Sequence, residues 1–227
     1  MAVLTACRKT TTSSYQKGSV EQKLSDFYKL AMDQKRRNKE GVKPVMPIIK
    51  KMEAAQTKEQ LFEIQKELMP YGDQQFMYMG FGADDKNASQ NILNIYQGGL
   101  TLGQKEYYLD NDEATAKIRE AYKNHIVTMF QLFGFKKGVA QQKMEQVLKI
   151  ETALAKVSKN RTELRDVEAN YNKMTLKEFE QKYPHVQLSE LAQAEGVDLK
   201  LIQDMIVGQP DFVAGADKVI VEMSADE

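Results

Sequence analysis

The chain has 227 residues, and its 32 lysines plus arginines balance its 32 aspartates plus glutamates, so the formal net charge is zero. Charges of both signs are mixed along the sequence, which gives no electrostatic reason to expect a nucleic-acid or anionic-membrane partner. A chain of this length can bury roughly 70–75% of its unfolded surface, enough for a substantial core.

The N-terminal residues MAVLTACRKT contain an apolar stretch that is shorter than the ~7–15 residues of a signal-peptide core, and no basic segment precedes it. We therefore expect Met1 to be the start of a fragment cut from a longer protein. Cys7 is the only cysteine and should be a small structural side chain. No apolar run approaches the ~20 residues of a membrane span, so we expect a soluble fragment.

Two segments near the N-terminus carry the capping-box pattern of helix starts, at 19–22 and at 57–60. Between them, Pro44 and Pro47 suit the first turn of a short helix. Apolar residues then recur at three- and four-residue spacing, which predicts amphipathic helices. These residues are Val20, Leu24, Phe27, Tyr28 and Ala31, then Ile48, Ile49 and Met52, then Leu61, Ile64 and Leu68.

The period changes after the turn at 70–72. Residues 76–81 and 92–96 are short runs dense in aromatic and β-branched residues, and they flank the polar segment 83–89. This pattern predicts a two-stranded antiparallel hairpin with a long turn. Apolar residues occupy both faces of the runs, so we expect the hairpin to lie between helices.

The second half of the chain is predicted to be helical. After the glycine-containing loop 98–103, a long helix should span about Asp112 to Phe133, with Gly134 as its C-terminal cap. A second long helix should carry Met144, Val147, Leu148, Leu154 and Val157. A third capping box stands at 175–178, Pro184 and Gly196 break the chain, and an extended stretch at 205–207 precedes a last helix near 211–222. The expected fold is mainly α, a multi-helix single domain over residues 1–227 with one small antiparallel β-hairpin.

Familiar catalytic and metal-binding patterns are missing. The two histidines, His125 and His185, lie sixty positions apart, and no HExxH motif places two imidazoles one helical turn apart to bind zinc. We expect His125 to be a structural histidine beside the apolar stripe of its helix and His185 to be exposed in a loop. Residues 84–87 resemble a calcium loop only faintly and should form a solvated turn. The glycines of 98–103 lack a phosphate-binding pattern and suit turns that need positive φ.

A polar, loop-like segment contains Arg161 and Arg165 just before Tyr171 to Met174. Buried arginines hold carboxylates through forked hydrogen bonds, which would suit a substrate or inter-domain contact. The simpler interpretation is a local ion pair with Asp166 or Glu168.

Several segments, in one order, resemble the N-terminal region of the neprilysin family of zinc metallopeptidases, which includes endothelin-converting enzyme and bacterial secreted peptidases. The most specific segment runs from Gln97 to Tyr108 and is similar to the pattern Q-x-G-L-x-L-x-x-[RK]-[DE]-Y-Y. The other similar segments are 21–33, 82–92, 161–176 and, as in bacterial members, 208–212. Together they cover roughly residues 19 to 220.

The resemblance implies the non-catalytic helical lobe of a bacterial member, which encloses the active-site cavity and restricts substrates to oligopeptides. It also implies that the zinc ligands lie downstream, so no catalytic or metal-binding residue can be assigned here and the fragment itself should need no cofactor. The implied partners are the downstream catalytic domain of the same chain and oligopeptide substrates. The implied location of the parent is extracytoplasmic: periplasmic, secreted or lipid-anchored.

Candidate inter-lobe or substrate contacts lie in two segments of the resemblance. The 98–109 segment combines glycines, leucines and tyrosines in a loop, and its apolar side chains either face the missing lobe or fill this domain's own core. The rival to the whole interpretation is a free-standing helical binding or scaffold module without peptidase activity. The candidate residues are Leu100, Leu102, Tyr107, Tyr108, Arg161 and Arg165.

Overall fold

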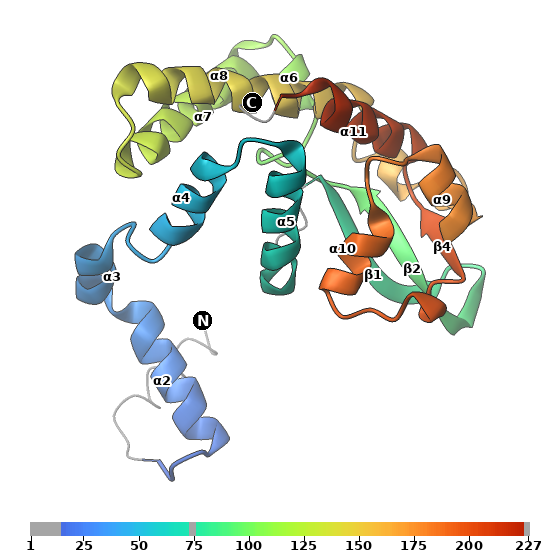
Figure 1. Cartoon of the computed structure of the whole chain (residues 1–227), viewed down its shortest axis with the longest axis horizontal. Helices are drawn as coiled ribbons and strands as arrows, with labels where there is room; N and C mark the ends of the chain where they lie inside the picture. The colour runs from blue at the N-terminus through green and yellow to red at the C-terminus, as the bar shows by residue number, and fades with distance from the viewer. Residues whose placement is uncertain (1–14, 73–75, 225–227) are drawn as a thin grey trace. The chain divides into compact units, whose positions relative to one another are not determined.

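The computed structural model describes residues 15–72 and 76–224 (Figure 1). Cys7 lies outside these residues. The chain divides into two compact units, Met1–Ile49 and Lys50–Glu227, and each is described by itself. None of the helices in the described ranges has the length and apolar character needed to cross a membrane.

The first unit contains α2 (Val20–Met32), α3 (Gln34–Glu40) and the start of α4 (Met46–Ala54). The Ser19 hydroxyl accepts a hydrogen bond from the Gln22 N–H at 3.2 Å, as the capping pattern predicts. The Gln22 side chain turns instead to the N–H of Gly18, so the reciprocal bond of the box is absent. The short helix α3 was not predicted, because its sequence QKRRNKE has no apolar periodicity.

The predicted apolar stripe of α2 remains largely exposed. Val20, Leu24 and Phe27 are 68%, 52% and 72% exposed, whereas the one buried side chain of the helix is the polar Ser25. The periodicity therefore predicts the helix correctly, but packing within the described chain does not cover its apolar face.

In the second unit, α5 (Lys58–Leu68) follows α4 and is capped by the Thr57 hydroxyl, which accepts from the Gln60 N–H at 3.3 Å. A short 3-10 turn, η1 (Met69–Tyr71), and Gly72 at φ +89° end this segment. The helix is only partly covered, since Ile64 is its one buried residue.

A four-stranded mixed sheet replaces the simple hairpin. Strands β1 (Met77–Asp84) and β2 (Asn87–Gln97) pair antiparallel, β2 pairs in parallel with β4 (Asp204–Val207), and β4 pairs antiparallel with β3 (Lys173–Thr175). The order is β1-β2-β4-β3. The long turn expected at 83–89 is wrong, because Asp84 pairs with Asn87 and the polar residues after it continue as an exposed strand.

One face of the sheet forms the main core. Leu93 and Ile95 of β2 and their parallel partners Met205 and Val207 pack with apolar side chains from α8 to α11. At the Tyr78–Tyr96 pair, on the opposite face, the side chains are 58% and 42% exposed. The expected cover of helices on both faces is therefore wrong at this end of the hairpin.

The long helices α7 (Glu113–Leu132) and α8 (Lys137–Val157) lie side by side (Figure 1). Asp112 caps α7, and Gly134, at φ +102°, ends it as predicted. The Phe135 N–H then donates to the Phe130 carbonyl at 3.1 Å, a bond typical of a glycine-terminated helix.

His125 of α7 is exposed, so its predicted structural role is wrong. It lies one position before Ile126 of the apolar stripe, and successive side chains on a helix point about 100° apart. His125 therefore points away from the core that Ile126 enters.

The rest of the unit consists of short elements. The third capping box is complete: the Glu178 N–H donates to the Thr175 hydroxyl at 3.2 Å, and the Thr175 N–H donates to the Glu178 carboxylate at 2.8 Å. The remaining elements are α6 (Glu106–Leu109), η2 (Glu163–Arg165), α9 (Leu176–Lys182), α10 (Leu188–Ala194), η3 (Leu199–Leu201) and α11 (Pro210–Glu222).

Helices α8 and α11 approach closely at Gly215. A Cβ atom at this position would lie 2.5 Å from Cγ2 and 3.0 Å from Cβ of Val157. We expect Gly215→Ala to destabilise the chain by about 1–3 kcal/mol through overpacking, despite alanine's better helix propensity. Gly138→Ala, in α8 where the added Cβ meets open space, should instead stabilise by up to about 1 kcal/mol. Thermal melts of both variants provide the check, and an unchanged or raised Tm for Gly215→Ala would contradict the close contact.

Candidate functional site

The 98–109 segment is fastened to the two long helices through a buried carboxylate. Glu151 of α8 is 6% exposed, and its Oε1 accepts hydrogen bonds from the Thr101 hydroxyl at 2.6 Å, the Thr101 N–H at 3.2 Å and the Tyr122 hydroxyl at 3.0 Å. Within the described residues, its Oε2 has no hydrogen-bond partner. Burial raises the pKa of the Tyr122 hydroxyl to about 12, and the charge of Glu151 acts in the same direction.

Tyr108 completes the inner side of this segment. Its hydroxyl accepts from the Leu102 N–H at 3.0 Å, and its ring is buried against α7 and α8. Burial raises the pKa of the Tyr108 hydroxyl well above its usual value. Leu100, Leu102 and Tyr107 are partly buried against the same core. The geometry thus favours the second of the two roles considered, in which these side chains fill the domain's own core.

The two glycine turns of the segment have the backbone expected of them. Gly99 and Gly103 adopt φ values of +72° and +78°, the left-handed region that side chains disfavour. Glu151 itself was missed by sequence reasoning. The signal for it is a glutamate placed three residues after Leu148 and three before Leu154, inside the apolar stripe of its helix.

Amide side chains join three of the segments on which the family resemblance rests; those of Asn170 and Gln209 are buried, and that of Gln97 is partly buried. Gln97 donates from Nε2 to the Lys159 carbonyl at 2.9 Å and accepts from the Lys159 N–H at 2.7 Å. The Gln209 Oε1 accepts from the Gln97 N–H at 2.8 Å, and its Nε2 donates to Asn170 Oδ1 at 2.9 Å. Segments far apart in sequence are therefore joined by amides that satisfy polar groups which folding withdraws, wholly or in part, from water.

The two candidate arginines are exposed in the segment after α8, Arg161 in a turn and Arg165 at the end of η2. With the Gln104 amide oxygen turned toward Arg161, it accepts from the guanidinium at 2.7 and 2.9 Å. Neither arginine forms an ion pair within residues 15–72 and 76–224, and Glu168 instead pairs with Lys86 at 2.9 Å. The simpler interpretation, a local ion pair, is therefore not what the structure shows.

The carboxylate of Asp84, at the hairpin turn, is occupied by hydrogen bonds within the chain. Asp84 is buried and accepts from the Lys86 N–H and the Tyr171 hydroxyl, both at 2.9 Å, while the Lys173 ammonium lies 3.7 Å away. The hydrogen bond from the Lys86 N–H, together with that from Tyr171 and the nearby Lys173 charge, lowers the pKa of the Asp84 carboxyl. This carboxylate already serves to join the turn to the loop that precedes β3.

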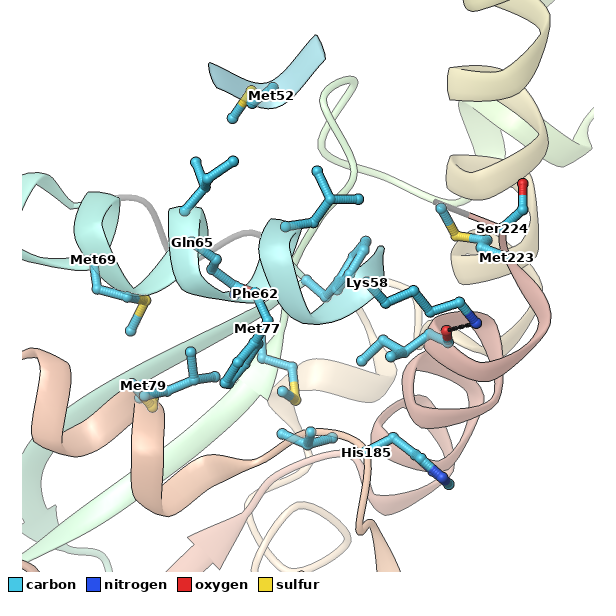
Figure 2. Close-up of a pocket in the computed structure, with 16 residues that line it drawn as sticks. Met52, Lys58, Phe62, Gln65, Met69, Met77, Met79, His185, Met223 and Ser224 are labelled. Atoms are coloured by element: carbon cyan, nitrogen blue, oxygen red, sulfur yellow. Dashed lines mark hydrogen bonds between the residues drawn. The ribbon is translucent and has the colours of Figure 1, made fainter. Parts of the chain in front are cut away.

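An apolar cavity of about 290 Å³ lies in the second unit, between α5, β1, the turn before α10 and the end of α11 (Figure 2). At one end, the Lys58 ammonium donates to the Ile220 and Val221 carbonyls at 3.0 and 2.6 Å. His185, exposed as predicted, lies at the same end and is hydrogen-bonded to Asp217. No local sequence pattern indicates this cavity, because its walls come from segments more than a hundred residues apart.

The histidine, cysteine, aspartate and glutamate side chains do not assemble into a metal site in the described part of the chain, where no group of three or more could hold an ion. With no HExxH motif in the sequence, these residues do not fit a catalytic zinc centre, and no step of zinc chemistry is assigned to them.

Comparison with known proteins decides the family. The model for the N-terminal region of peptidase family M13 matches residues 2–227. The chain belongs to peptidase family M13. The sequence resemblance to the N-terminal region of the neprilysin family is thereby confirmed.

Relatives of this M13 chain are much longer than it is. It is 36% identical over 106 residues to endothelin-converting enzyme-like 1 of Rattus norvegicus, covering 46% of this chain and 13% of the relative. It is 28% identical over 173 residues to endothelin-converting enzyme 1 of Homo sapiens, covering 73% of this chain and 22% of the relative.

Solved structures share the fold. Zinc metalloprotease Zmp1 of Mycobacterium tuberculosis, in complex with an inhibitor, matches with a TM-score of 0.89 at 20% identity, over 99% of this chain and 34% of that one. PepO from Lactobacillus rhamnosis matches with a TM-score of 0.75 at 19% identity, over 99% and 35%. The M13 chain thus spans about a third of these two proteins.

Proposed function

We propose that the chain is the non-catalytic lobe of a neprilysin-like zinc metalloendopeptidase, which encloses the active-site cavity and restricts substrates to oligopeptides. The family match over residues 2–227 carries this proposal. The same fold accounts for 34% of a zinc metalloprotease, while this sequence contains no HExxH motif. Zinc and the catalytic groups then belong to the remainder of the parent protein.

The internal bonding of the lobe supports a role as a rigid wall. The Glu151 carboxylate holds the 98–109 segment on α8, and the paired amides around Gln97 join the 159–172 segment to the end of β2 and the start of α11. Of the six candidate contacts, Arg161 and Arg165 keep exposed side chains and are proposed to reach the other lobe or the substrate. Leu100, Leu102, Tyr107 and Tyr108 then support this surface from beneath.

Partners and location follow from the same proposal. The partner is the catalytic region of the same polypeptide, and the substrates are oligopeptides that enter the space between two lobes. Zmp1 has been described in an open state and a partial open state, which suits a lobe that moves over a cavity. We place the parent outside the cytoplasm of a bacterium, as the resemblance to secreted members implies.

The test compares the 227-residue chain with the parent protein. The chain alone should contain no stoichiometric zinc and show no cleavage of a short peptide, because it offers too few ligands at metal-binding spacing. The parent should contain zinc and cleave the peptide but not a folded protein. Zinc content by elemental analysis and chelator-sensitive cleavage are the measurements.

Two results would contradict the proposal. One is stoichiometric zinc with chelator-sensitive cleavage by the chain alone. The other is a parent reading frame without HExxH, which would favour the free-standing binding module.

The proposed contacts of the two arginines can be tested in the parent. The double variant Arg161→Ala/Arg165→Ala should raise KM for the peptide severalfold, because both proposed contacts are lost. Lys117→Ala removes an exposed cation on α7 and should leave KM unchanged.

A further inference from the structure

The cavity beneath α5 has the size and lining of a small-molecule site. Its volume of about 290 Å³ is close to the lower end of the ~300–1,000 Å³ usual for ligand pockets. An apolar cavity of roughly 150 Å³ already binds benzene, so this space can take a body of about two aromatic rings. Its walls are mainly apolar and include five of the chain's 12 methionines: Met52, Met69, Met77, Met79 and Met223.

The methionines make the walls adaptable. A methionine side chain is unbranched and flexible, and its sulfur packs favourably against aromatic rings, so methionine-rich surfaces accept ligands of varied shape. Figure 2 shows Met69 and Met79 at one end of the cavity and Lys58 and His185 at the other, beside α11. Helix α5, which forms one wall of the cavity, is attached to α10 by the Lys66–Glu190 ion pair at 2.9 Å, and its Ile64 is buried.

The charges at the cavity select a neutral ligand. The Lys58 ammonium is already bonded to two carbonyls at the C-terminal end of α11, where the helix dipole disfavours an anion. His185 is bonded through both its N–H and its Nδ1 to Asp217, at 2.8 and 3.0 Å. A charged ligand would therefore lose its hydration on entering the cavity without gaining an ion pair to Lys58 or His185, which are already bonded. The remaining polar side chains at the wall, such as Gln65, offer neutral hydrogen-bonding groups.

We propose that this cavity binds a neutral, mainly apolar small molecule of about two aromatic rings, or a medium-chain aliphatic body, with at most one hydrogen-bonding group. The ligand lies between α5 and β1, with its apolar body against the methionines and its polar group toward Gln65. Binding of such a molecule here requires no peptide cleavage by the chain.

Prodan (6-propionyl-2-dimethylaminonaphthalene) is a suitable probe because it is neutral, has two fused aromatic rings and carries one hydrogen-bonding carbonyl group. Titrated into the 227-residue chain, it should give saturable fluorescence enhancement with one site per chain. Leu61→Trp, which fills the cavity from α5, should weaken binding at least tenfold. Leu132→Trp, the same change at an exposed position on α7, should leave affinity within twofold, as should Phe27→Lys on the exposed face of α2.

Methionine-methyl NMR tests the location without any variant. The probe should shift the methyl signals of the five cavity methionines and leave those of Met32 and Met129 in place. Non-saturable binding, equal affinity of Leu61→Trp and wild type, or shifts at the exposed methionines would each overturn the proposal. So would binding to the 227-residue chain that disappears in the parent protein, because the cavity would then be filled by the parent's own polypeptide.

Discussion

Ile95→Asp is expected to destabilise the chain by about 4 kcal/mol or more. Ile95 is fully buried near the C-terminal end of β2, where the strand is paired with both β1 and β4, and its side chain lies in the main core. The substitution removes a large apolar side chain and places a carboxylate where no described cation faces it. At roughly 2–4 °C per kcal/mol for a chain of this size, Tm should fall by about 10 °C or more in a circular-dichroism melt.

Two control variants separate burial from general sensitivity of the sheet. Tyr78→Asp puts the same carboxylate on β1 at a side chain that is 58% exposed, so the cost should be about 1 kcal/mol or less. Asn87→Ala removes an exposed bond at the turn, from the Ser89 hydroxyl to Asn87 Oδ1, and should change little. Equal Tm values for Ile95→Asp and wild type would show that the core assignment of β2 is wrong.

Tyr108→Ala should cost about 3–5 kcal/mol, because it deletes a buried aromatic ring and removes the acceptor for the Leu102 N–H. The ring packs with Tyr122, Ile126 and Ala155, so its loss leaves a cavity between the 98–109 segment and both long helices. The expected result is a Tm lower by roughly 10 °C and faster proteolysis within this segment.

Tyr108→Phe keeps the ring and loses only the hydroxyl, so it should cost about 1–3 kcal/mol. Tyr71→Ala, at a tyrosine that is 87% exposed, should stay within about 0.5 kcal/mol of wild type. If Tyr108→Ala were as stable as Tyr71→Ala, the tyrosine would have to serve the surface rather than the core. Tyr108 itself would then be expected to contact the other lobe or the substrate.

The amino-acid sequence determined those features that depend on a few neighbouring residues. The caps at Ser19, Thr57 and Thr175 and the ending at Gly134 bond within one helical turn, so their local pattern sufficed. The two strands of the hairpin were placed for the same reason, since runs of aromatic and β-branched residues are a local signal, although the turn between them was predicted too long. The order of the motifs along the chain also predicted the family. That order does not predict which of these segments contact one another in the fold.

Tertiary structure decided what brings distant segments together. Strand β4 joins β2 across more than a hundred residues, and the polar β3 is a strand only because β4 offers it free backbone groups. Glu151 is buried because Thr101 and Tyr122 supply donors, which periodicity cannot reveal. Likewise, the apolar spacing of α2 forecast a helix but not whether anything covers it. Local bonds follow from neighbouring residues, whereas burial depends on which surfaces the fold brings into contact.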